Sequence, residues 1–219
     1  MPDGPASANT VDNPFFARLW SKLSTHEPES IRRLRRENVA GLTGRVLEVG
    51  AGTGTNFEFY PATVTEVVAI EPEQRLAVLA RRAADEASVP VTVSSDTIER
   101  YAVLSAEEPF DAVVCSLVLC SIDDPDSVLR QLFSILRPGG ELRYLEHVAS
   151  TGLRARMQRL ADATVWPRLL GNCHTHRHTE RSIVDAGFEV DGARREWVLP
   201  PWVPMPASET AIGRAVKPA

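Results

Sequence analysis

A glycine-rich segment that directly follows a short apolar run places the strongest constraint on the fold of this chain. The run Arg45-Val46-Leu47-Glu48-Val49 leads into Gly50-Ala51-Gly52-Thr53-Gly54. Glycines permit a tight strand-to-helix turn and let the backbone approach a nucleotide closely. The segment therefore predicts a strand, a turn and a helix that together hold a nucleotide-like ligand.

Strand and helix patterns alternate along the rest of the chain. Apolar runs at 67–70, 91–93, 110–115 and 141–147 predict further strands, and helical spacing occurs at 74–87 and from Asp124 to Leu136. Asp124 should cap the second of these helices, with Pro125 in its first turn. This alternation is typical of an α/β fold with a parallel sheet and helices on both faces. Extended segments at 187–199 and 211–216 predict an antiparallel pair at one edge of the sheet.

A length of 219 residues suits one domain. We expect a flexible tail at 1–13, followed by a single domain at 14–219. Within this domain, two helices at 14–41 form a lid, 45–148 form the cofactor-binding core, and 149–219 supply acceptor-side helices and closing strands. Pro28 marks the start of the second lid helix. Thr179 is expected to cap a later helix.

Composition narrows the class of partner. The net charge of −5 and the pI of 5.6 argue against a nucleic-acid partner, and the basic run at 32–36 is interpreted as a solvated helix face. The three cysteines form no C-x-x-C pair, which predicts free thiols in a cytoplasmic protein. No apolar stretch is long enough to span a membrane. We therefore expect a small-molecule acceptor and a protein that is not integral to a membrane.

Two ligands compete for the glycine turn. A dinucleotide site has the spacing G-x-G-x-x-G, whereas here the third dinucleotide position is Thr55. Glu48 would repel a pyrophosphate but would suit a cationic ligand with an amino-acid end, such as S-adenosylmethionine (SAM). Glu71, 21 residues after Gly50 and at the end of the second strand, can accept hydrogen bonds from ribose hydroxyls of either ligand. Asp96, after the third strand, lies where it could meet the adenine amino group.

Four motifs occur in order: VLEVGAGTG, VVAIEP, FDAVVCSLVLCSI and LRPGGELRYLEH. With them the chain resembles the class I SAM-dependent methyltransferases over residues 45–148. The segments GTGTNFEFYP, SLVLCSIDDP, YLEHV and AIGRAVK are similar to the alkyl-thiol S-methyltransferases of the methyltransferase-like family, and quinone-biosynthesis C-methyltransferases are more distant. The resemblance implies a Rossmann-like fold whose seven-stranded sheet has the order 3-2-1-4-5-7-6, with the last strand antiparallel.

The same resemblance implies which residues hold SAM. The methionine end would be lined by the first loop, the ribose held by the second-strand acid, the adenine met after the third strand, and the cofactor underlain by the end of the fourth. The residues at the methionine end are Glu48, Gly50, Gly52 and Asn56, and Thr53 and Gly54 of the same loop would also bind the cofactor. The ribose is held by Glu71 with Pro72 beside it, the adenine is met by Asp96 and Thr97, and the residues beneath the cofactor are Ser116, Leu117 and Leu119.

Candidates on the acceptor side are fewer. His147, at the end of the fifth strand, is either a general base or a histidine that only hydrogen-bonds a loop. His174, His176 and His178 alternate as zinc ligands can, but no fourth ligand is evident, so we expect a loop without a metal. The resemblance implies that His174 borders the acceptor pocket. The tryptophans outside the core motifs either line that pocket or only pack; they are Trp20, Trp166, Trp197 and Trp202.

The expected function is transfer of a methyl group from SAM to a small apolar acceptor, with a thiol as the first choice. A lipid or quinone methyltransferase at a membrane face is the alternative. In that case the first helix, with Phe15, Phe16 and Trp20, would be a shallow membrane-contacting surface instead of a lid. A SAM-binding protein without catalytic activity is a third hypothesis.

Overall fold

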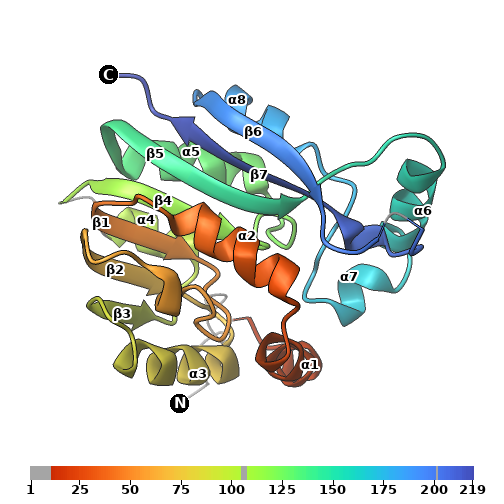
Figure 1. Ribbon diagram of the computed structural model, residues 1–219, viewed down its shortest axis with the longest axis horizontal. Coiled ribbons are helices and arrows are strands. Elements are labelled where there is room, and N and C mark those ends of the chain that lie inside the picture. Colours follow the sequence, from red (N-terminus) through yellow and green to blue (C-terminus); the bar gives the residue numbers. More distant parts are fainter. Residues whose placement is uncertain (1–10, 105–107, 201) are drawn as a thin grey trace, which may run out of the picture.

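The computed structural model describes residues 11–104, 108–200 and 202–219, so most of the predicted tail at 1–13 lies outside the described residues. A seven-stranded sheet of order β3-β2-β1-β4-β5-β7-β6 forms the centre (Figure 1). Neighbouring strands are parallel, except that β7 is antiparallel to β5 and β6. This confirms the predicted strand order and the antiparallel edge pair. The strands are β1 (Gly44–Val49), β2 (Val64–Ile70), β3 (Val91–Ser94), β4 (Phe110–Ser116), β5 (Leu136–His147), β6 (Glu189–Trp197) and β7 (Glu209–Val216).

Helices cover both faces of the sheet, with α2 in front and α5 and α8 behind in Figure 1. Alternate residues of β1 enter different cores, because successive side chains of a strand point to opposite faces. Val46 packs with Val39 of α2 and Ala80 of α3. Leu47 packs with apolar residues of α5 and α8 on the other face. The helices are α1 (Pro14–Thr25), α2 (Glu29–Val39), α3 (Gln74–Asp85), α4 (Ile98–Leu104), α5 (Pro125–Ile135), α6 (Gly152–Asp162), α7 (Trp166–Leu169) and α8 (Thr179–Asp185).

Local capping explains where several helices begin. The Asp124 carboxylate accepts the N–H of Ser127 at 2.9 Å, and Pro125 opens α5, as predicted. Pro28 is the N-cap of α2, which also agrees with the sequence. The prediction for Thr179 is wrong: His178 occupies the N-cap of α8, and the Thr179 hydroxyl is buried without a hydrogen-bond partner among the described residues.

Some elements extend beyond the sequence prediction. The strand expected at 141–147 begins at Leu136, because Leu136 pairs with Phe110 before the register shifts. The first part of β5 is joined to the residue after β7: Gly139 donates its N–H to the Lys217 carbonyl at 2.9 Å, and Lys217 donates its N–H to the Gly140 carbonyl at 2.8 Å. Helix α4 was not predicted, and α6 and α7 lie in the segment 149–219, where helices were expected without stated bounds.

The parallel strands β1, β2, β4 and β5 all end at one edge of the sheet, where ligands bind in open α/β folds. The helices α1, α6 and α7 lie at this side in Figure 1. In the described part of the chain, no helix combines the length and apolar character that crossing a membrane requires.

Candidate functional site

The glycine turn after β1 has the backbone that its sequence predicts. Gly50 and Gly52 have φ of +67° and +59°, a region that residues with a Cβ rarely adopt. A Cβ on Gly50 would strike the Val118 side chain, and one on Gly52 would lie 2.8 Å from Nε1 of Trp20. The turn is therefore enclosed by the loop after β4 on one side and by α1 on the other.

Glu71, at the end of β2, lies against this turn. One carboxylate oxygen accepts the N–H of Gly52 at 2.7 Å, and the other accepts the N–H of Glu73 at 2.9 Å. Each oxygen retains a lone pair, so the carboxylate can also accept two hydroxyl groups, as a ribose diol presents. Burial raises the pKa of Glu71 to about 7, against the two backbone hydrogen bonds.

Glu48, which is 2% exposed, is a second buried carboxyl beside the glycine turn. The glycine turn at 50–54 together with Glu48 and Glu71 is called the cradle below. The Glu48 oxygens accept the Tyr60 hydroxyl at 2.7 Å and the Asn56 amide at 2.9 Å. Burial raises the pKa of Glu48 to about 7, although both hydrogen bonds and the charge of Arg35 lower it. Two buried carboxyls beside a glycine turn fit a ligand that carries positive charge, because a cation favours their ionised forms.

A polar network joins the cradle to α2. Asn56 donates to the Ser116 hydroxyl at 3.1 Å, and Asn38 donates to the same hydroxyl at 3.2 Å. Arg35 donates to the Asn56 oxygen at 3.2 Å. Asn56 and Ser116 were expected to lie at the cofactor, whereas Asn38, Arg35 and Tyr60 were not identified from the sequence.

The basic run at 32–36 is not wholly the solvated face that was expected. Arg35 is 2% exposed, and its Nε donates to both carboxylate oxygens of the buried Glu27 side chain, at 3.0 and 2.9 Å. Buried charges require such partners. The sequence does indicate that Arg35 is buried, because Arg35 lies one helical turn from Ile31 and from Val39 on the apolar face of the helix.

The residues expected at adenine lie after β3. The Asp96 carboxylate accepts the Ser94 hydroxyl at 3.0 Å and is 3.2 Å from the Arg100 guanidinium. Thr97 follows it and is partly buried. At the end of β4, Leu117 has φ of +60° and donates its N–H to Leu145 at 2.7 Å, so the chain turns sharply where it was expected to pass beneath the cofactor.

His147 lies at the end of β5, as predicted, but its ring meets two thiols. Its Nδ1 is 3.6 Å from Sγ of Cys120 and 3.5 Å from Sγ of Cys173. The neighbouring Glu146 is fully buried and accepts the N–H groups of Val118, Leu119 and Cys120 at 2.9, 3.0 and 3.3 Å. Glu146 thus fixes the loop after β4, a role that the sequence did not indicate.

The three histidines of the loop before α8 have different partners. The N–H of His174 donates to the Cys120 carbonyl at 2.8 Å, and the ring of His176 lies 3.1 Å from the Arg159 guanidinium. The rings of His176 and His178 meet edge to face. Within the described ranges, these three imidazoles do not form a metal-ligand group.

Helix α1 bridges two loops. Phe16 and Trp20 stack with ring centroids 6.0 Å apart. Trp20 lies over Gly52, and Phe16 lies 2.8 Å from where a Cβ on Gly171 would stand, whereas Phe15 is 57% exposed. The helix thereby joins the cofactor turn to the loop that carries Cys173.

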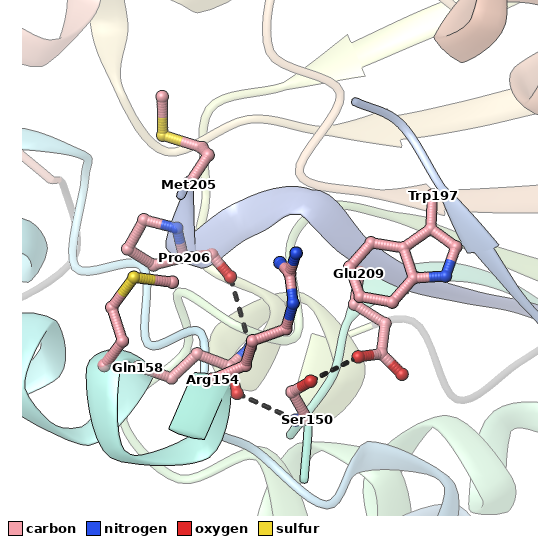
Figure 2. A pocket seen from close by; sticks show the side chains of 8 residues that line it. Ser150, Arg154, Gln158, Trp197, Met205, Pro206 and Glu209 are labelled. Carbon is pink, nitrogen blue, oxygen red and sulfur yellow. Dashed lines mark hydrogen bonds between the residues drawn. The ribbon is translucent and has the colours of Figure 1, made fainter. Parts of the chain in front are cut away.

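A pocket next to β7 is shown in Figure 2. The Glu209 carboxylate accepts Ser150 at 2.6 Å and pairs with Arg195 at 2.8 Å, and Trp197 stacks with Arg154 at 4.6 Å. Ser150, Glu209 and Arg195 therefore satisfy one another beside this pocket. Trp202, another tryptophan considered for the acceptor pocket, is 82% exposed and therefore packs little against the described residues.

Comparison with known proteins agrees with this geometry. A family model described as "Methyltransferase domain" matches residues 19–191. Thiol S-methyltransferase TMT1B of Mus musculus is 33% identical over 217 residues, covering 93% of this chain and 85% of that protein.

Solved structures with the same fold include the N-methyltransferase NodS of Bradyrhizobium japonicum in complex with S-adenosylhomocysteine (TM-score 0.63, 17% identity, 95% of this chain and 90% of that one). A SAM-dependent methyltransferase of Thermotoga maritima superposes similarly (TM-score 0.64, 21% identity, 93% and 98%). The chain belongs to the methyltransferase domain family and is a SAM-dependent methyltransferase.

Proposed function

We propose that this enzyme transfers the methyl group of SAM to the sulfur of a small apolar thiol. One observation carries the proposal: the similarity to a thiol S-methyltransferase extends along 93% of the chain, through the acceptor-side segments as well as the cofactor core. The three cysteines are buried free thiols, which supports a reducing compartment such as the cytoplasm.

SAM supplies an electrophilic methyl group, and the chain supplies its binding and alignment. We assign the methionine end to Glu48, Gly50, Gly52 and Asn56, with Thr53 and Gly54 in the same loop. We assign the ribose to Glu71 and Pro72, the adenine to Asp96 and Thr97, and the underside to Ser116 and Leu117. The buried carboxyls and the open hydrogen-bond positions of Glu71 support this arrangement.

Alignment accounts for most of the expected rate enhancement. Holding nucleophile, methyl and sulfonium in line can lower the barrier by ~7–11 kcal/mol. A thiol has a pKa of about 8.5, so a modest shift gives the thiolate, whereas a phenol at about 10 depends more on a base. We place His147 beside the acceptor. Because its Nδ1 faces two thiols, a role as general base would use Nε2.

The test is release of S-adenosylhomocysteine across a panel of small alkyl thiols, phenols, amines and quinones. We expect turnover with the thiols to exceed that with the other classes by about tenfold or more, because the thiolate is the strongest nucleophile near neutral pH. Turnover confined to phenols, amines or quinones would overturn the choice of acceptor.

Gly52→Val and Gly192→Val form a matched pair for the cofactor site. Both glycines have positive φ, +59° and +76°, so both substitutions strain the backbone. A side chain at Gly52 projects into the cradle toward Trp20, whereas one at Gly192 on β6 has no neighbour within 4 Å. We expect Gly52→Val to abolish SAM binding by calorimetry and Gly192→Val to retain it. Equal affinities would refute the cofactor placement.

A further inference from the structure

Two thiols and an imidazole meet at the acceptor end of the sheet. Cys120 follows β4, His147 ends β5, and Cys173 lies between α7 and α8. The two Sγ atoms are 3.5 Å apart, and Nδ1 of His147 is 3.6 and 3.5 Å from them. Both cysteines are buried, at 1% and 6% exposure. These are the donor types that zinc prefers.

The spacing of these donors matches one face of a zinc tetrahedron. Zn–S bonds of about 2.3 Å and Zn–N bonds of about 2.05 Å at tetrahedral angles place two sulfurs about 3.8 Å apart and a sulfur about 3.6 Å from a nitrogen. The observed separations are 3.5, 3.6 and 3.5 Å. One ion would contact all three atoms with shifts of a few tenths of an ångström.

Other interpretations of the cluster fit less well. A disulfide would require the sulfurs to approach from 3.5 Å to about 2.05 Å, with the histidine left aside. In a cluster held only by hydrogen bonds, Nδ1 has either one lone pair or one proton and serves one thiol, although both lie equally near. A metal ion engages both thiols and the imidazole together.

The three segments are held in place independently of any ion. The N–H of His174 donates to the Cys120 carbonyl at 2.8 Å. The Asn172 amide donates to the Ser121 carbonyl and to Asp123, both at 2.8 Å, which ties the Cys173 loop to the Cys120 loop. The buried Glu146 carboxylate holds the Cys120 N–H at 3.3 Å. Such supporting hydrogen bonds are what orient the ligands of a metal site.

We propose that Cys120, His147 and Cys173 bind one Zn²⁺ ion whose fourth position accepts the sulfur of the acceptor thiol. The acceptor part rests on the proposed function. Three protein ligands with one open position is the pattern of catalytic zinc sites. The cluster also adjoins the cofactor cradle, because Val118, two residues before Cys120, covers Gly50.

On binding, the acceptor thiol loses its proton to water and remains as a zinc-bound thiolate, since a coordinating thiol is deprotonated. The thiolate electron pair forms the new S–CH₃ bond while the methyl–sulfonium bond breaks, and that bond's electrons stay on the departing S-adenosylhomocysteine. The thioether product is a weaker ligand and leaves the ion. With Nδ1 on the metal, Nε2 of His147 stays protonated, so the ion takes over the activation that a base would provide.

Metal binding is tested on the full-length protein, by elemental analysis as purified and with Co²⁺ after a chelator has removed its metal. We expect one Zn²⁺ per chain by elemental analysis, and with Co²⁺ the sulfur-to-cobalt charge-transfer band and intense visible bands of a tetrahedral thiolate site. Cys120→Ala, Cys173→Ala and His147→Ala should each weaken Co²⁺ binding by about tenfold or more. Cys115→Ala and His176→Ala, which change a thiol and an imidazole outside the cluster, should bind as wild type.

The wild-type Co²⁺ spectrum decides the question even where a variant fails to fold. Absence of the charge-transfer band, or a Cys120–Cys173 disulfide found by mass spectrometry in protein that takes up no metal, would overturn the proposal. Mercaptoethanol added to the Co²⁺ form should intensify the band, and no change would overturn the open position. Undiminished thiol methylation by metal-free protein would overturn this inference but leave the proposed function intact. A zinc-loaded protein that methylates only phenols or amines would overturn the proposed function and the acceptor part of the inference.

Discussion

Replacing Glu48 with glutamine should remove a pH dependence from the stability of the ligand-free protein. Burial raises the pKa of this carboxyl from 4.5 to about 7 in the folded state. Between these values the folded state binds more protons than the unfolded state, so the free energy of unfolding falls as pH rises through the window. The full loss, reached above about pH 7, is about 3 kcal/mol at 1.36 kcal/mol per pH unit.

The assay is urea denaturation followed by tryptophan fluorescence at a series of pH values. Subtracting the wild-type curve from that of Glu48→Gln cancels the similar contribution of Glu71, whose pKa is also raised to about 7. The difference should change by about 3 kcal/mol in favour of the variant between about pH 4 and pH 8. Glu99→Gln, at an exposed carboxyl of α4, is the control and should follow wild type. Parallel curves for wild type and Glu48→Gln would refute the reasoning.

Arg35→Ala should destabilise the protein by about 3–5 kcal/mol in the same denaturation assay, because it leaves the buried Glu27 unpaired; a loss below about 1 kcal/mol would contradict a buried pair. Tyr144→Phe should be neutral or stabilise by about 1 kcal/mol, because the Tyr144 hydroxyl is buried without a partner among the described residues, and a large loss would reveal a missed bond. SAM binding at neutral pH should release protons from Glu48 and Glu71, seen in calorimetry as a heat that depends on the buffer, and S-adenosylhomocysteine should release fewer. Identical heats in all buffers would contradict that coupling.

The order of the sheet was predicted from the resemblance to the class I SAM-dependent methyltransferases, whereas the shape of the cofactor turn was predicted from the residues themselves. The cofactor turn and the alternation of strands and helices depend on local signals: an apolar run before Gly50 and Gly52, acids after the second and third strands, and Asp124-Pro125 at a helix start. Strand alternation then determines which edge collects these residues. The start of β5 was not predictable, because the hydrogen bonds of Gly139 and Gly140 with Lys217 join segments far apart in the chain.

The polar network and the thiol cluster could not be read from spacing. Cys120, His147 and Cys173 are separated by 27 and 26 residues, and no spacing rule for metal ligands covers such intervals. Arg35 and Tyr60 likewise reach the cradle only through packing of α2 and of the loop after β1. Only the helical position of Arg35 on the apolar face gave a usable signal.

The charges of the cradle bear on the choice of ligand. Without a ligand, burial disfavours the ionised forms of Glu48 and Glu71 and raises the pKa of each carboxyl to about 7. A pyrophosphate would raise both further, because like charges oppose ionisation, so its binding would have to overcome two protonation equilibria. A sulfonium with an ammonium group acts in the opposite direction and returns both carboxyls to the charged state near neutral pH. With SAM in the proposed position, the buried Glu48 carboxyl therefore favours it over a dinucleotide, in addition to the spacing of the glycines, whereas Glu71 would serve the ribose of either ligand.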